Sequence, residues 1–100
     1  MANRIELSGR LATAPSMRVT PAGTAVMSIV VDCGERAGEM RMPIVLAGEH
    51  ARELTTRLKA GLSVRARGSL RPINLRQGRT STGLGVEVVA DEVTLAEAAN

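Results

Sequence analysis

The side chains with the clearest chemical potential in this 100-residue chain are its arginines, which make up all but one of its 13 basic residues. A guanidinium group donates paired hydrogen bonds to phosphate or carboxylate and stacks on flat rings. Arginines at alternate positions of an extended segment would project from one face, and such a basic surface suits repeated phosphate groups. The candidate contacts are Arg18, Arg36, Arg41, Arg65, Arg67, Arg71, Arg76 and Arg79.

Residue types that serve catalysis or metal binding occur without partners. His50 is the only histidine and Cys33 the only cysteine, so no internal disulfide and no zinc site of the usual type can form. Asp91 and Glu92 are adjacent in an extended segment, which should point them to opposite faces and exclude an acid pair. The glycines form no common phosphate-cradling motif. We therefore predict that the chain is not an enzyme and needs neither metal nor cofactor.

Length and composition predict one globular domain spanning residues 1–100. The formal net charge is +3 and aromatic content is 0%, so the core must be built from aliphatic residues and methionine. No apolar run reaches the roughly 18 residues of a membrane span, and no secretory signal opens the chain. These features lead us to expect a cytoplasmic protein that does not associate with membranes.

Five segments have the alternating or β-branched pattern of strands. In the first, Ile5, Leu7, Gly9 and Leu11 share one face, where the glycine would allow the strand to bend. Proline and glycine predict a loop or irregular hairpin over residues 12–23, a turn over 33–39 and a polar loop over 72–83. The predicted strands cover residues 4–11, 24–32, 40–47, 62–71 and 84–95. Pro43 cannot donate a ladder hydrogen bond and predicts a bulge or an edge in the third of them.

One amphipathic helix is expected between the third and fourth strands. Gly48 would begin it, Ala51, Leu54 and Leu58 would form its apolar face, and Gly61 would close it. This order of elements predicts an all-β fold, a five-stranded barrel of the oligonucleotide-binding (OB) type with one helix. In such a barrel the candidate arginines border a common groove for single-stranded nucleic acid. Without aromatic stacking, binding should be weak, steeply dependent on salt and little dependent on sequence.

Nearly the whole chain resembles the primosomal replication protein N (PriB) family. The resemblance lies in NRIELSGRLATAPSMRVTPAG, MPIVLAG, GLSVRARG and VADEVTL. It implies a homodimeric OB fold that binds single-stranded DNA and contacts the primosomal helicase and other primosome proteins during replication restart. Arg18 matches a basic position of the family, and Arg76 and Arg79 loosely match a basic cluster. A stacking tryptophan of the family falls at Glu39, and a family lysine falls at about Gly85.

Three alternatives remain open. One is a tail-less general single-stranded DNA-binding protein: bacterial proteins of this kind share the fold but add a linker and an acidic tip, whereas this sequence ends in AEAAN. The missing aromatics and Glu39 also fit an OB module that binds mainly protein. A barrel that binds RNA or transfer RNA has the same charge pattern.

Overall fold

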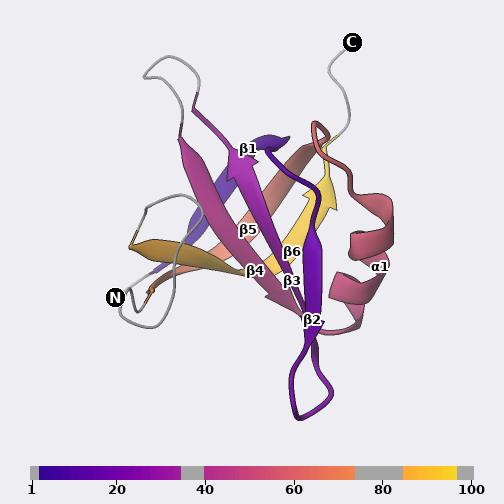
Figure 1. Cartoon of the computed structure of the whole chain (residues 1–100). Helices are drawn as coiled ribbons and strands as arrows, with labels where there is room; N and C mark the ends of the chain where they lie inside the picture. Colours follow the sequence, from indigo (N-terminus) through magenta and orange to yellow (C-terminus); the bar gives the residue numbers. More distant parts are fainter. Residues whose placement is uncertain (1–2, 35–39, 74–84, 97–100) are drawn as a thin grey trace.

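The computed structural model describes residues 3–34, 40–73 and 85–96. These residues form one helix and six strands, which Figure 1 labels in chain order. The elements are β1 (Ile5–Leu11), β2 (Ser16–Val19), β3 (Ala25–Asp32), β4 (Arg41–Ala47), α1 (Glu49–Arg57), β5 (Ser63–Pro72) and β6 (Val86–Leu95). No helix in these ranges is long and apolar enough to cross a membrane.

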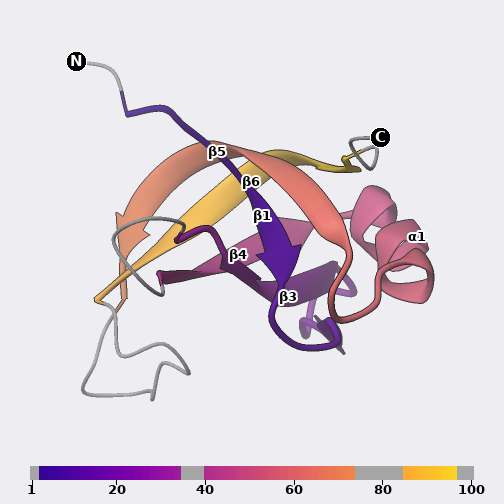
Figure 2. The same cartoon turned by 90° about the horizontal axis from the view of Figure 1, so that it is seen from above.

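The strands form one sheet that closes on itself, because β1 pairs with both β5 and β3. The order is β1-β5-β6-β4-β3-β2, and β1 also pairs with β3 at Arg10 and Leu11. All neighbours are antiparallel except β4 and β6, which are parallel. Figure 2 shows β5 and β6 arching over β3 and β4, with α1 at one end. The predicted mostly β architecture with one helix is therefore confirmed.

The interior is aliphatic, as the composition requires. Along β3, every second residue from Ala25 to Val31 is buried. Of the alternate residues, Val26 is also buried, whereas Ser28, Val30 and Asp32 are half-buried. Helix α1 contributes Ala51 and Leu54, and Leu58 follows it; all three side chains are buried in the same core. The period-two and period-3.6 patterns therefore identify the core-facing residues of β3 and α1 correctly.

The strand count is the main correction to the sequence-based fold. Five strands were expected, but residues Ser16–Val19 within the predicted loop or hairpin form a sixth, β2, paired with β3. All four of its residues are exposed, so this strand has no buried face to produce an alternating pattern. Its turn is held by the hydrogen bond from Thr20 N to Thr24 O, with Gly23 at φ 89°.

The helix also ends earlier than predicted. Its C-cap is Leu58, which is already extended, so Gly61 does not close the helix. Gly61 does adopt a positive φ of 91°, but in the following turn, where its N–H bonds to the carbonyl of Leu11. The prediction that Gly61 closes the helix was therefore wrong, because its tether to β1 is a contact distant in sequence that no local pattern specifies.

Pro43 lies in a strand with neighbours on both sides. Hydrogen bonds from Cys33 N to Met40 O and from Gly48 N to Ala25 O bracket the β3–β4 ladder. Hydrogen-bonded and non-hydrogen-bonded pairs alternate along an antiparallel ladder, so Pro43, opposite Val30, occupies a non-hydrogen-bonded position. Its missing N–H therefore removes no hydrogen bond from the β3–β4 ladder. Strand β4 is therefore not the edge strand that the proline suggested.

Strand β6 contains a bulge at Asp91. Arg67 pairs with Glu92 and Gly68 with Ala90, which leaves Asp91 unpaired. Gly68 faces the bulge so closely that a Cβ built on it would lie 2.1 Å from the carbonyl oxygen of Val89. The strand predicted over residues 84–95 is thus one continuous strand that contains a bulge.

Candidate nucleic-acid interface

The outer face of β3 and β4 differs from the other outward surfaces because its centre carries no charge. Ser28 and Val30 of β3 lie opposite Val45 and Pro43 of β4, and all four are half-buried. They line a pocket of about 310 Å³ between the segment that precedes β2 and the start of β6. Its lining residues are Thr13, Ala14, Ser16, Ser28, Ile29, Val30, Pro43, Ile44, Val45 and Glu87.

Two of the predicted arginines lie on the same face as this pocket, near opposite ends. Arg18 lies opposite Val26 and is two positions from Ser16 in β2. It therefore projects from the same side of β2 as Ser16, which lines the pocket. Arg41 pairs with Asp32 and projects from the side of β4 that carries Pro43 and Val45. Because β4 is seven residues long, its ends are separated by about 20 Å. The pocket lies between these ends.

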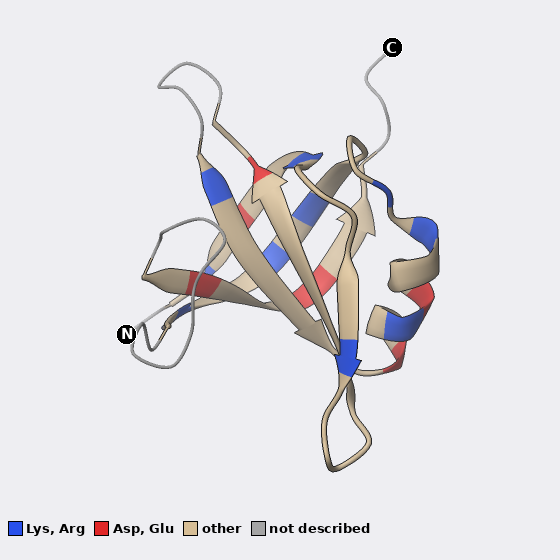
Figure 3. Ribbon diagram, in the orientation of Figure 1, with Lys and Arg blue, Asp and Glu red and all other residues tan. Residues whose placement is uncertain are grey.

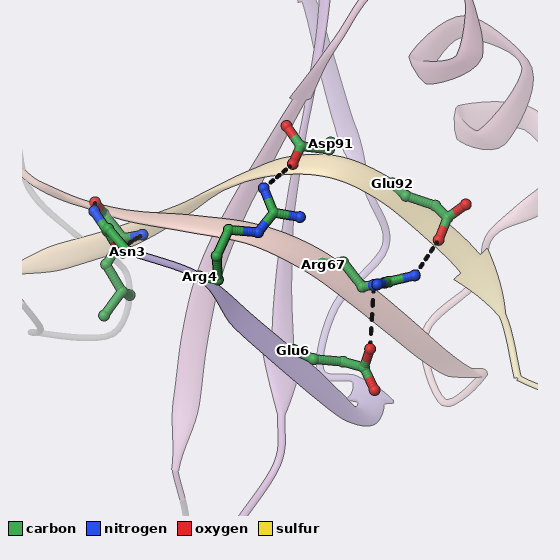
Figure 4. Close-up of polar contacts among 7 residues, drawn as sticks. Asn3, Arg4, Glu6, Arg67, Asp91 and Glu92 are labelled. Atoms are coloured by element: carbon green, nitrogen blue, oxygen red, sulfur yellow. Dashed lines mark hydrogen bonds and ion pairs between the residues drawn. The ribbon is translucent and has the colours of Figure 1, made fainter. Parts of the chain in front are cut away.

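The three arginines of β5 lie on a different surface, formed by the outer faces of β1, β5 and β6. Arg67 contacts Glu6 at 3.2 Å and Glu92 at 3.8 Å, one on each neighbouring strand (Figure 4). Arg65 lies opposite Ser8 and Thr94 and pairs with no carboxylate in the described part of the chain. Figure 3 shows acidic and basic residues interleaved over these strands instead of a continuous basic stripe.

Arg71 connects the two surfaces through an ion pair with Glu87. Its Nε lies 3.0 Å from Oε2 of Glu87, and its Nη2 contacts the same oxygen. The side chain of Glu87 is 17% exposed and that of Arg71 56%. Glu87 also lines the pocket, so Arg71 lies at its β6 side.

The eight predicted arginines therefore do not all lie on one described surface. Arg18 and Arg41 share the face of the pocket, and Arg71 borders it, whereas Arg65 and Arg67 lie on the charged β1–β5–β6 face. Arg36, Arg76 and Arg79 lie outside the described residues.

The bulge overturns the prediction that Asp91 and Glu92 point to opposite faces. Asp91 contacts Arg4 at 2.9 Å while Glu92 contacts Arg67, and Figure 4 shows both pairs on the outer surface. An extra residue in one strand shifts the alternation by one position. Among the described residues no group of three His, Cys, Asp or Glu side chains could hold a metal ion.

A second pocket, of about 390 Å³, lies where β1, β3 and β5 come together. It is lined by Ser8, Gly9, Arg10, Asp32, Cys33, Gly34 and Ser63. Burial raises the pKa of the Cys33 thiol, the charge of Asp32 raises it further, and a backbone hydrogen bond has a smaller, opposite effect. The thiol also contacts the carbonyl of Met40 at 3.6 Å.

We expect Cys33 in the folded chain to react more slowly with iodoacetamide than in the chain unfolded in urea. The thiolate is the reactive form, and a raised pKa lowers its fraction at about pH 8. The folded chain holds this proton more tightly, so the contribution of Cys33 to stability is full below the pKa of the unfolded thiol. It is lost as the pH rises through the folded pKa. Equal rates in both states, followed by mass spectrometry, would contradict the assignment.

Comparisons with known proteins agree with this fold. The model of the single-strand binding protein family matches residues 2–96, and the chain therefore belongs to that family. The structure superposes on that of the wild-type single-stranded DNA binding protein from Thermus aquaticus with a TM-score of 0.80 and 23% sequence identity. The match covers 99% of this chain and 42% of the Thermus chain. No curated protein matches the chain significantly.

Sequence reasoning missed the pocket because it searched for charge. Arg18, Arg41 and Arg71 were named from its surroundings, whereas Ser28, Pro43 and Glu87 received no role in binding. One signal was available: outward positions of the strands at 24–32 and 40–47 are uncharged between their ends. The outward positions of the other long strands carry several charges.

Proposed function

We propose that the chain binds single-stranded DNA across the outer face of β3 and β4. Membership of the single-strand binding protein family supports this function. The observation that carries the location is the hollow face between Arg18 and Arg41, whose central β3 and β4 residues carry no charge. Such a surface can hold bases at its centre while guanidinium groups contact phosphates at its margins. We also infer that the ring of β1, β3, β4, β6 and β5 is a five-stranded OB barrel, with β2 as an added hairpin strand.

The function is tested by titrating a fluorescein-labelled oligonucleotide with the protein and with two single variants. Arg18→Ala should weaken binding several-fold and reduce the slope of log K against log salt by about 0.7, the value for one phosphate of a single strand. Arg67→Ala removes the same charge, but this guanidinium already lies between two carboxylates. It should leave both the affinity and the slope almost unchanged.

Two outcomes would reject parts of this proposal. An absence of binding at low salt would reject the DNA-binding function itself. Equal losses in Arg18→Ala and Arg67→Ala would retain the function but show that only net charge matters, because the two variants differ in position and not in charge.

We further propose that the protein acts as an accessory factor of replication restart and docks the primosomal helicase as a homodimer. The family resemblance in the sequence motivates this role. An available strand edge supports the dimer: β1 pairs with β3 only at Arg10 and Leu11, so Ile5 to Gly9 pair with β5 alone among the described strands. An unpaired edge is a site where a second chain can add its own strand. Light scattering would give the mass in solution.

A protein-interaction module with little DNA binding is the second candidate. The interleaved charges of the β1–β5–β6 face favour it, because ion pairs already neutralise Arg67 and Arg71 there. Helicase binding that survives Arg18→Ala combined with Arg41→Ala, while oligonucleotide binding is lost, would support this alternative.

A further inference from the structure

Among the described residues that line the pocket on the outer face of β3 and β4, Glu87 is the only one with a charged side chain. The other side chains are hydroxyls of Thr13, Ser16 and Ser28, and apolar groups such as Val30 and Pro43. Pockets that bind small molecules begin at about 300 Å³ and combine apolar walls with a few polar groups. We propose that this pocket holds one base of the bound strand and that Glu87 selects a base with an exocyclic amino group. This inference rests on the proposed binding of single-stranded DNA.

The contacts of Glu87 leave one of its oxygens available. Both contacts from Arg71 go to Oε2, and Oε1 has no hydrogen-bond partner among the described residues. A carboxylate oxygen only accepts hydrogen bonds. Cytosine, adenine and guanine each present an amino donor, whereas thymine presents the acceptor O4 at the position of the cytosine amino group. A thymine bound in the position of cytosine would therefore turn O4 toward Oε1 and lose this hydrogen bond, because its own donor, N3–H, lies at the neighbouring position of the ring.

The rest of the pocket does not discriminate in this way. A hydroxyl rotates to donate or to accept, so Ser16 and Ser28 can bond to either kind of base edge. Val30, Pro43 and Val45 offer apolar surface to any base. Arg71 lies against the same carboxylate and offsets its charge, which reduces repulsion of the neighbouring phosphates. Glu87 is thus the side chain that would add a base preference to binding that the arginines alone would leave little dependent on sequence.

Base preference separates this pocket from the surrounding arginines. Contacts to phosphate bind every sequence alike, because the backbone is the same for all bases. A carboxylate that accepts from the cytosine amino group is a recognised mode of base readout. A preference for cytosine over thymine, which are similar in size, would therefore report on the pocket and not on charge.

The test compares labelled homopolymers of deoxycytidine and deoxythymidine of equal length with the full chain at low salt and about pH 8. We expect wild-type protein to bind the cytidine strand at least about fivefold more tightly. In Glu87→Gln the amide can donate to O4 of thymine, so the ratio of the two affinities should fall toward one. Glu92→Gln is the matched control: it removes a carboxylate from the same strand, one paired with Arg67 and outside this pocket. It should preserve the ratio.

Each result decides the inference. Equal or tighter binding of the thymidine strand by wild-type protein would overturn the pocket and leave the DNA-binding function in place. An unchanged ratio of the cytidine and thymidine affinities in Glu87→Gln would also overturn the pocket. Binding of neither strand would reject the DNA-binding function, and the inference with it. If circular dichroism shows that Glu87→Gln does not fold, Ser28→Leu fills the pocket from its β3 wall and should reduce cytidine binding to the thymidine level.

Discussion

Raising the salt concentration from about 50 mM to about 500 mM should weaken binding of a single-stranded oligonucleotide several hundredfold. For single strands, log K falls by about 0.7 per log unit of salt for each phosphate neutralised. Arg18 and Arg41 flank the pocket, and Arg76 and Arg79 are predicted to add two more contacts. About four contacts give a slope of about −3, and a tenfold rise in salt then produces this loss.

The salt dependence should dominate the affinity because the chain contains no aromatic residues. Stacking of a base on an aromatic ring contributes about 1–3 kcal/mol and does not depend on counterion release. With an aromatic content of 0%, the chain has no such contribution to retain affinity at high salt. Fluorescence anisotropy across the salt series gives the slope. A slope shallower than about −1, with tight binding at high salt, would show that contacts in the pocket supply most of the affinity.

Gly68→Ala should lower the free energy of unfolding by about 3 kcal/mol, at the upper end of the usual cost of overpacking. The new Cβ would lie 2.1 Å from the carbonyl oxygen of Val89 and 2.7 Å from Cα of Ala90. Both are backbone atoms of β6 beside the bulge, so relief requires the β5–β6 ladder to move. A domain with a total stability of roughly 5–15 kcal/mol would lose a large fraction of it.

Gly23→Ala provides the control for this substitution. Gly23 has a positive φ of 89°, and a Cβ there would meet nothing within 4 Å. Only conformational strain of about 1 kcal/mol should result. Far-ultraviolet circular dichroism in urea suits both variants, because the chain contains no aromatic reporter. Equal losses in the two variants would show that the contact at the bulge is not the cause.

Much of the fold could be predicted from local patterns. The alternation in residues 24–32 identified the buried face of β3, and the spacing of Ala51, Leu54 and Leu58 identified the buried face of α1. Gly9 was expected on the inner face of β1, and a Cβ there would lie 2.3 Å from the carbonyl oxygen of Asp32. These features repeat along a single segment, so they can be recognised without knowing its neighbours.

The predictions that failed depend on neighbours. Strand β2 is held by its ladder to β3 and buries no residue, so hydropathy gives no sign of it. The bulge at Asp91 arises from the pairing of β6 with β5, and it turns Asp91 and Glu92 toward the same surface. A strand pattern assumes unbroken alternation, and a bulge breaks it only in the paired state.

The sequence by itself determined an aliphatic core, a mostly β chain with one helix, and a supply of arginines for phosphate. Those properties depend on residue type and on short spacings. Only the tertiary structure decided which arginines are neutralised and where a base could enter. Arg67 and Arg71 meet carboxylates on neighbouring strands, and the pocket is assembled from four segments distant in sequence. Strand pairing sets these distances, because the register brings each side chain beside a residue that no local pattern specifies.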